Sequence, residues 1–544
     1  MLIRKKMPRP HGLNEPILHR DNHGRPVTRR ELISAGLMTG PAVVAATGLL
    51  GMLVNPRRAL ATLADDIDDL KSPCNIQGGA GKIPFICFDL AGGANLNGSE
   101  ALIGNRGGQL DFLSTAGYAR LGLPGDMVPN AGNAASATNF IDTSFGLAWH
   151  SDGAILLGML ERTSPGTREL TNGCVIAARS ENDTGNNPHN PMYGILKTGA
   201  RGELLTLIGS QASESGGNSM APIAMVDPAN RPTKVDRASD VTGLVDTGDT
   251  TVLPASAATA TLESMVRLSG GIDTVNVGTA GKLGKLDLRI SRDTDIKKAL
   301  NCAYVKSAYL ADQFSDKAAL NPDLDEQIVD QSATRGTGIF SRAEYNGDGE
   351  FRKTAAVMKM VINGYAGAGT ITMGGYDYHD GTRATGEVRN LRAGRCIGAC
   401  LEYAARMNKP VMIYVFSDGS LSATNMLDNS ANGRGKFGWQ GDNQSVANSF
   451  FLVYSPTGRP AALREDPAGG LGKQIGYYRA DGSVETASHP GANAVNLLVE
   501  TVVLNYLALH GAAEAAAFQS LFPRHGLGNE EYRRETLTAF APII

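Results

Sequence analysis

The alternation of short buried apolar runs with longer helical segments constrains the fold of this chain more than any other feature of its sequence. Residues 83–90 and 173–179 are nearly continuous apolar runs that lead into loops, as buried strands do. Further strands are expected at 370–373, 410–416 and 449–454, and helices at 151–162, 351–363, 387–407 and 492–510. Buried strands alternating with helices predict an α/β fold, in which a mainly parallel sheet has helices on both faces.

The sequence predicts a single α/β domain over residues 62–544, interrupted by one loop-rich insertion. Residues 211–285 are rich in Gly, Ser, Ala, Thr and Asp and have little periodicity. Such a segment is more often a surface excursion than a mobile lid, although the lid is the functional alternative. The chain as a whole has 42% hydrophobic and 19% charged residues, which is the composition of a globular protein.

The amino-terminal 61 residues differ in charge from everything that follows. They contain ten Lys and Arg against three Asp and Glu, whereas the remainder contains 41 against 51. Within them, Arg29 and Arg30 precede a weakly apolar run over 35–54, and Ala59-Leu60-Ala61 has the small residues of a cleavage site. This pattern resembles a twin-arginine export signal that is cleaved after Ala61. The alternative is an uncleaved membrane anchor, because a run of about 20 residues can span a bilayer.

Export would make the twin-arginine translocation machinery the first partner of the chain and place the mature protein in the periplasm or outside the cell. The net charge of −10 after residue 61 argues against nucleic acid as a partner. An even number of cysteines permits disulfides in such a compartment without specifying a pairing. We interpret Cys396 and Cys400, four residues apart in an expected helix, as small buried residues.

Candidate site residues follow the predicted strands, where open α/β sheets place their sites. Asp377 and His379 come after the strand at 370–373, Asp418 follows the strand at 410–416, and Asp442 lies in the next loop. Carboxylates and imidazoles are suitable ligands for a divalent metal such as zinc, magnesium or calcium. Each residue also has a structural alternative, because Asp and Asn favour turns and helix caps after strands.

The order of these motifs resembles an uncharacterised twin-arginine-exported family of the alkaline phosphatase and sulfatase superfamily. The resemblance covers about residues 83–460. It rests on Gly92-Gly93-Ala94-Asn95-Leu96-Asn97, Ala148-Trp149-His150, Pro188-His189-Asn190, Gly374-Gly375-Tyr376-Asp377-Tyr378-His379, Phe416-Ser417-Asp418-Gly419-Ser420 and Gly441-Asp442-Asn443-Gln444. It implies an alkaline-phosphatase-like fold and a metal site formed by Asp377, His379, Asp442, His189 and the shortened carboxylate Asp418.

Three positions depart from the family pattern. Asn95, Pro188 and Asn443 stand where the family has Asp, Ser and His. Replacing Asp with Asn removes a charge that would hold a cation, and proline has no nucleophilic hydroxyl group. Two hypotheses follow: a catalytically degraded relative that serves as an extracytoplasmic binding or assembly component, which we favour, and a metal-dependent hydrolase of small phosphate or sulfate esters.

Overall fold

The computed structural model describes residues 63–71, 73–74, 81–129, 139–180, 187–245, 255–269, 293–314, 317–331, 336–464 and 472–544. These residues form two compact units. The first takes its described residues from Met1–Asn75 and Thr247–Ser315, and the second from Ile76–Asp246 and Asp316–Ile544. The expected export signal, with Arg29, Arg30 and the cleavage site at Ala61, lies outside the described residues.

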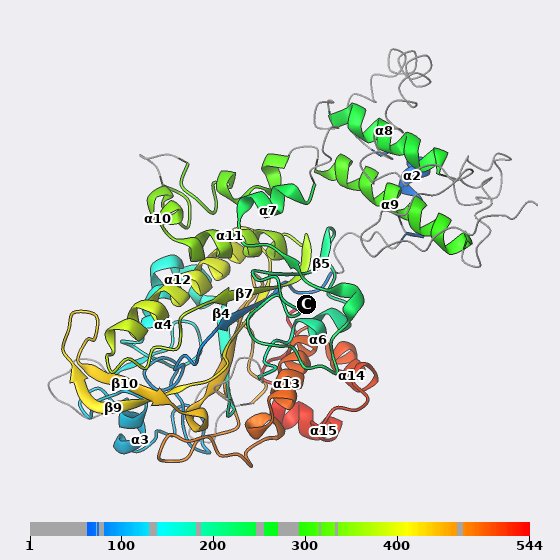
Figure 1. Ribbon diagram of the computed structural model, residues 1–544. Helices are drawn as coiled ribbons and strands as arrows, with labels where there is room; N and C mark the ends of the chain where they lie inside the picture. The colour runs from blue at the N-terminus through cyan, green and yellow to red at the C-terminus, as the bar shows by residue number, and fades with distance from the viewer. Residues whose placement is uncertain are drawn as a thin grey trace, which may run out of the picture. The chain divides into compact units, whose positions relative to one another are not determined.

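The second unit is built on an eight-stranded sheet with the strand order β12-β4-β11-β8-β1-β7-β5-β6 (Figure 1). The strands are β1 (Phe85–Leu90), β4 (Thr171–Ala177), β5 (Leu205–Gly209), β6 (Thr233–Lys234), β7 (Ala366–Met373), β8 (Val411–Ser417), β11 (Asn448–Tyr454) and β12 (Gln474–Ile475). All neighbours are parallel except the two pairs that β11 makes with β4 and β8. The predicted α/β architecture with a mainly parallel sheet is therefore confirmed, with one antiparallel strand.

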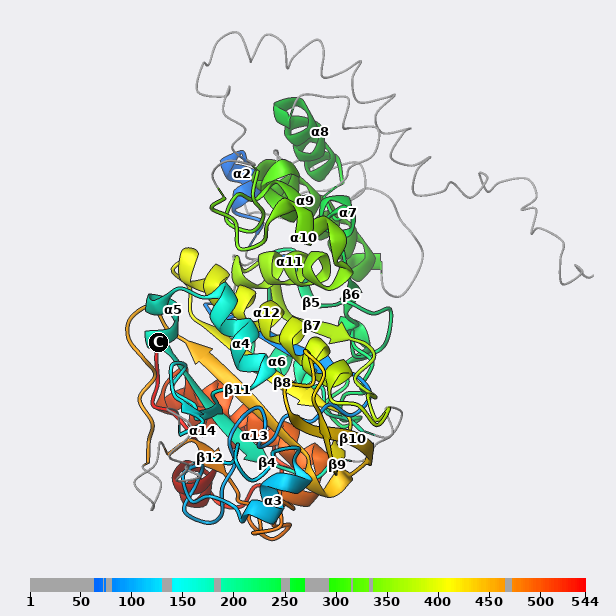
Figure 2. The same ribbon diagram turned by 90° about the vertical axis from the view of Figure 1, so that its left-hand side faces the viewer.

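Helices cover both faces of this sheet, as Figures 1 and 2 show. On one face lie α11 (Gly349–Ile362) and α12 (Ala384–Arg406), with α4 (Ala154–Arg162) packed against α12. On the other lie α6 (Met192–Lys197) and α13 (Val495–Ala508), with α14 (Ala512–Leu521) packed against α13. Because both faces are covered, every residue of β1, β7 and β8 is buried.

The close packing of α4 against α12 depends on glycine. A Cβ at Gly394 would lie 2.1 Å from the carbonyl oxygen of Ile155, and a Cβ at Gly158 would lie 2.3 Å from that of Leu391. Neither distance is possible for a real side chain, so the two helix backbones approach each other only because these positions have none. Part of the high glycine content of the chain is thus used inside the helical layer.

The remaining elements of the second unit are short, apart from one hairpin. The hairpin pairs β9 (Leu421–Asp428) with β10 (Lys436–Asp442) in antiparallel fashion. The others are α3 (Thr115–Arg120), β2 (Ile141–Asp142), β3 (Trp149–His150), α5 (Pro165–Glu169), α7 (Ala238–Gly243), α10 (Arg342–Gly347) and α15 (Glu530–Tyr532), with short 3-10 and π turns between them. No helix in the described part of the chain is long and apolar enough to cross a membrane.

The first unit contains α2 (Asp65–Asp68) and two longer helices, α8 (Ala255–Leu268) and α9 (Asp293–Gln313), which lie side by side (Figure 1). The side chain of Asn301 on α9 donates to the carbonyl oxygen of Val266 on α8 at 3.1 Å. A disulfide joins Cys74 to Cys302. The other four cysteines are buried and are not part of a disulfide, and the interpretation of Cys396 and Cys400 as small buried residues is confirmed.

The division into two units differs from the expected single domain with an insertion over 211–285. Residues 211–245 belong to the second unit, whereas the 255–269 segment joins the first unit and forms α8. The difference has a physical origin, because α8 is rich in Ala, Ser and Thr and has few large apolar residues with which to display a helical period. It packs against α9, the next helix along the chain.

Candidate functional site

Polar side chains gather where β1, β7 and β8 end at a common edge of the sheet. The register aligns Leu90 at the end of β1 with Met373 of β7 on one side and Ser417 of β8 on the other. The antiparallel strand β11 begins at the same edge, because Asn448 is opposite Ala177, the last residue of β4. The loops that follow these strands therefore meet in one place, as the sequence predicted for a site in an open α/β sheet.

Three of the predicted ligands come together at this edge. Asp377, His379 and Asp442, which we call the Asp-His-Asp cluster, each offer one ligand atom, and these atoms all lie within 4.8 Å of one another. The Nε2 atom of His379 lies 2.7 Å from a carboxylate oxygen of Asp377 and 3.9 Å from one of Asp442. All three side chains are between 41% and 58% exposed, so a bound ion would also face water.

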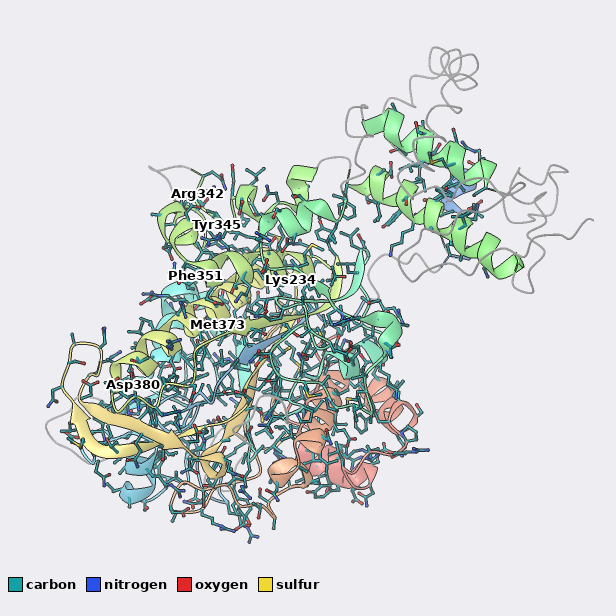
Figure 3. All side chains as sticks on the ribbon, in the orientation of Figure 1. Lys234, Arg342, Tyr345, Phe351, Met373 and Asp380 are labelled. Atoms are coloured by element: carbon teal, nitrogen blue, oxygen red, sulfur yellow. A yellow bond between two sulfur atoms is a disulfide. The ribbon has the colours of Figure 1, made fainter. Side chains whose placement is uncertain are left out.

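A close approach of two backbones fixes the loop that carries Asp377 and His379. This loop follows Met373, the last residue of β7, and continues to Asp380; both residues are labelled in Figure 3. The amide of Tyr376 donates to the carbonyl oxygen of Ala91 after β1. The next residue, Gly92, has a φ of +123°, and a Cβ there would lie 2.6 Å from the amide nitrogen of Asp377. Only glycine permits both the conformation and the contact.

The hairpin β9–β10 brings Asp442 to the same place. The backbone of Trp439 on β10 pairs with the loop that leaves His379, since it accepts from the Gly381 amide at 2.8 Å and donates to the Thr382 carbonyl at 3.0 Å. Asp442 is the last residue of β10. The sequence analysis expected Asp442 in a loop, and it missed the hairpin because only one face of β9 is buried and much of that strand is polar.

Asp418 and His189, the other two predicted ligands, do not belong to the cluster. Asp418 is buried and one of its carboxylate oxygens accepts from the Gly92 amide at 2.6 Å. His189 is also buried, lies 2.6 Å from the hydroxyl group of Ser180 through Nε2, and stacks on Phe416. Burial lowers the pKa of His189 to about 3, which keeps the imidazole neutral. Both side chains form contacts within the protein instead of facing the cluster.

Of the three positions that depart from the family pattern, Asn95 and Asn443 form hydrogen bonds within the protein, and Pro188 directly precedes a buried residue. The side-chain oxygen of Asn95 accepts from the Asn97 amide at 3.2 Å, and its side-chain nitrogen donates to the Leu421 carbonyl at 3.4 Å. Asn443 accepts from the amide and hydroxyl groups of Ser445 at 3.1 and 2.7 Å, and so caps a short 3-10 helix. Pro188 is followed by the buried His189. For the two asparagines, the structural alternative considered for Asn after strands accounts for their side chains.

Asp89 in β1 is a buried carboxylate at the same edge that holds a neighbouring segment. It accepts hydrogen bonds from the amides of Asn218 and Ser219 at 2.7 and 2.9 Å, and from the hydroxyl groups of Ser219 and Thr372. Burial raises the pKa of Asp89 to about 6, partly offset by these donors. Asp89 therefore fixes the 218–219 backbone to the sheet and is not exposed to solvent.

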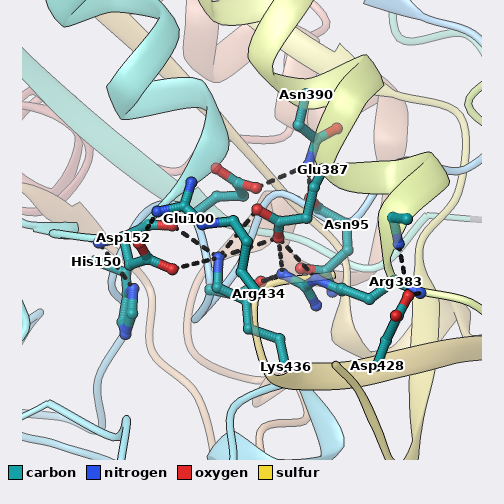
Figure 4. A network of polar contacts seen from close by, with 12 residues as sticks. Asn95, Glu100, His150, Asp152, Arg383, Glu387, Asn390, Asp428, Arg434 and Lys436 are labelled. Carbon is teal, nitrogen blue, oxygen red and sulfur yellow. Dashed lines mark hydrogen bonds and ion pairs between the residues drawn. The ribbon is translucent and has the colours of Figure 1, made fainter. Parts of the chain in front are cut away.

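Next to the hairpin lies a second group of ionisable residues that the sequence analysis missed. Glu100, Arg383, Glu387 and Lys436, which we call the buried charge network, are all at most 4% exposed (Figure 4). Glu387 on α12 accepts from Arg383 at 2.7 Å and from Lys436 on β10 at 3.0 and 3.1 Å. The network thus joins α12 to the hairpin that carries Asp442.

Glu100 completes the buried charge network and also caps a helix. One of its carboxylate oxygens accepts from the Ile155 amide in the first turn of α4, and the other accepts from the side chain of Asn390 on α12. Burial and the nearby Glu387 raise the pKa of Glu100 to about 7, and burial lowers the pKa of Lys436 to about 8. The signal in the sequence that could have indicated this network is the i, i+4 spacing of Arg383 and Glu387. Such pairs usually lie on exposed helix faces.

The residues of the Asp-His-Asp cluster are suitable ligands for a metal ion. Two carboxylates and one imidazole are ligands that zinc accepts, and the carboxylates also suit magnesium and calcium. Three protein ligands leave coordination positions for water or an anionic group. The coarser expectation of a possible divalent-metal site therefore agrees with the geometry.

Comparison with known proteins identified no relative. No family model matches the chain, and neither a curated protein nor a solved structure is detectably similar to it.

Proposed function

We propose that this chain is an exported, catalytically degraded relative of the alkaline phosphatases and sulfatases that serves as an extracytoplasmic binding or assembly component. In this proposal the Asp-His-Asp cluster holds one divalent cation. The cation offers its remaining coordination positions to an oxygen ligand of a partner, such as a carboxylate or phosphate group. The alkaline-phosphatase-like fold is part of the proposal and rests on the order of the sequence motifs together with the mainly parallel sheet.

One observation carries the proposal. Three exposed ligands from two separate segments meet within 4.8 Å, while the other two predicted ligands are buried and hydrogen-bonded elsewhere. A superfamily site with two metals needs more ligands than this cluster offers. Asn95 and Asn443, which replace two site residues of the family pattern, support internal turns and caps. This combination favours binding of a single cation over phosphoryl or sulfuryl transfer.

Export is supported by two independent features. The leader has the paired arginines, the apolar run and the small-residue site of a twin-arginine signal. The disulfide between Cys74 and Cys302 would form and persist in an oxidising compartment such as the periplasm. The partners proposed are accordingly the twin-arginine translocation machinery during export and an unidentified extracytoplasmic component afterwards.

The test is cation binding by the purified mature chain. After removal of metal with a chelator, calorimetric titration with zinc, magnesium and calcium should show one saturable site for at least one of them. Asp377→Asn should weaken that binding by at least about tenfold, because it removes one of three ligands. Asp380→Asn is the matched control, since Asp380 is an exposed carboxylate three residues away that accepts only from nearby threonines. Absence of saturable binding for all three cations would sink the proposal.

A second function, hydrolysis of small phosphate or sulfate esters, is favoured by the three-ligand geometry. Catalytic zinc sites commonly have three protein ligands and an open position where the metal activates water. Assays with nitrophenyl phosphate and nitrophenyl sulfate in the presence of the bound cation test this alternative. Turnover that Asp377→Asn abolishes, and that Asp380→Asn leaves unchanged, would replace the binding proposal with the hydrolase.

A further inference from the structure

We infer that a groove beside α12 binds a small organic anion with an apolar body, independently of the cation site. The groove has a volume of about 840 Å³ and lies between the α10–α11 junction, α12 and the turn of the hairpin. This volume is within the range of roughly 300–1,000 Å³ that is typical of small-molecule sites. We call it the α12 groove.

Three arginines of α12 line the groove, spaced three residues apart. Arg395 is paired with Glu161 at 2.5 Å. Among the described residues, Asp348 is the one carboxylate within ion-pair distance of Arg392, at 3.9 Å, and the buried Nε of Arg392 has no hydrogen-bond partner there. Arg389 donates to the Gly374 carbonyl, and no described carboxylate lies within ion-pair distance of it. Two guanidinium groups therefore retain donors for a ligand.

The two acidic residues that line the groove are engaged in helix caps. Glu344 forms a capping box with Ser341 and pairs with Arg162. Asp348 is the cap of α11, where its carboxylate accepts from the Glu350 amide at 2.8 Å. Among the described residues, Arg389 has no carboxylate within ion-pair distance and the one beside Arg392 is 3.9 Å away, so the positive charges of these two arginines are only partly compensated. Guanidinium groups with free donors bind carboxylate, phosphate and sulfonate oxygens well.

Apolar side chains supply the remaining wall of the groove. Phe351 is a buried residue of this wall, whereas Val388, which directly precedes Arg389 on α12, is 49% exposed. Leu391 adds to the same wall. An inorganic ion would leave this surface exposed, so the ligand that matches the groove combines an oxyanion with an apolar or aromatic body.

The test uses phenylphosphonate, which has both parts and no ester bond to hydrolyse. Calorimetry on the mature protein at low salt should show saturable binding. Arg389→Gln and Arg392→Gln should each weaken it by about tenfold or more, as expected for loss of a hydrogen bond to a charged group. Val388→Asp should have the same effect through charge repulsion. Arg524→Gln, at an exposed arginine elsewhere, is the control and should leave the affinity unchanged.

Three outcomes would overturn the inference. They are the absence of saturable binding up to ~10 mM phenylphosphonate, wild-type affinity in all three groove variants, and inorganic phosphate binding as tightly as phenylphosphonate, which would remove the role of the apolar wall. The cation-site variant Asp377→Asn should bind phenylphosphonate normally. Loss of anion binding in that variant would contradict the independence of the two sites, whereas failure of cation binding alone leaves the groove unaffected.

Discussion

Strand β10 has an ionisable side chain at each end, and the two ends have opposite surroundings. Lys436 at its start is fully buried and bonded to Glu387, whereas Asp442 at its end is about half exposed and faces His379. At each end a carboxylate lies beside a basic side chain: Glu387 beside Lys436, and Asp442 beside His379. The comparison shows that burial and saturation with partners, rather than residue type, separate a structural charge from one that can bind a ligand.

The largest expected change in unfolding free energy comes from replacing Lys436, at the buried end of β10. Lys436→Met leaves Glu387 with one cation fewer, and breaking a buried ion pair costs about 3–5 kcal/mol of unfolding free energy. Urea denaturation would measure this loss, with Lys409→Met as the control at an exposed lysine. Cation affinity should also fall, because the hairpin that carries Asp442 loses one of its links to α12. A loss below about 1 kcal/mol would mean that the network does not anchor the hairpin.

The next largest effect is the stabilisation of the folded chain by a bound cation, which tests Asp442 at the exposed end of β10. A cation that binds only the folded chain stabilises it by about 2.7 kcal/mol when its concentration is one hundred times the dissociation constant. Thermal or urea unfolding with and without the cation measures this gain. Asp442→Asn should reduce it to about 1.4 kcal/mol or less at the same cation concentration, because the variant removes a ligand and weakens binding at least about tenfold. An equal gain in wild type and variant would show that the cation binds somewhere else.

A smaller effect is expected for the pH dependence of the unfolding free energy. It concerns His150, which lies beside the buried charge network (Figure 4). Burial, with Lys436 nearby, lowers the pKa of His150 from 6.5 to about 3. The unfolded chain therefore takes up a proton between pH 6.5 and 3 that the folded chain does not, so this residue destabilises the fold as the pH falls.

The slope for one such histidine is about 1.4 kcal/mol per pH unit. Glu100, whose pKa is raised, contributes with the opposite sign below pH 7. The measurement is therefore the difference in unfolding free energy between wild type and His150→Gln as a function of pH. The variant should lose less stability than wild type as the pH falls from 6.5 toward 4. Parallel profiles would mean that His150 is not protected from protonation.

The smallest expected effect is that of Asp377→Asn on stability without metal. The side chain is 58% exposed and its pair with His379 is in contact with water. Such substitutions change the unfolding free energy by less than about 0.5 kcal/mol. Chemical denaturation in the presence of a chelator checks this value. A loss above about 2 kcal/mol would indicate that the cluster is a structural element like the buried end of β10.

The secondary structure that surrounds the site was largely predictable. The strands at β1, β4, β7, β8 and β11 and the helices at α4, α11, α12 and α13 were expected from apolar runs and helical spacing. These elements are buried on most sides, so their sequences carry a clear signal. The hairpin β9–β10 and helix α8 carry little of it, since one is partly exposed and the other consists mostly of small residues.

The candidate ligands were predicted as a set, but their roles were not. Sequence placed Asp377, Asp418 and His379 after strand ends, where turns expose side chains. It could not show that Asp418 accepts from the Gly92 amide, because this contact joins residues 326 positions apart in the chain. Nor could it show that His189 contacts Ser180, although these residues are only nine positions apart, because the contact depends on how the loop between them folds.

By itself, the sequence determined the α/β architecture and the strand ends that carry polar residues, because these depend on local composition and periodicity. The export signal stays a prediction from the sequence. Only the tertiary structure decided which carboxylates and imidazoles are exposed and close together, and which are buried and saturated with partners. The physical reason is that the state of an ionisable group depends on its distance to donors, charges and water, and distant parts of the chain supply these. The α12 groove has the same origin, since it forms only where α10, α11, α12 and the hairpin turn come together.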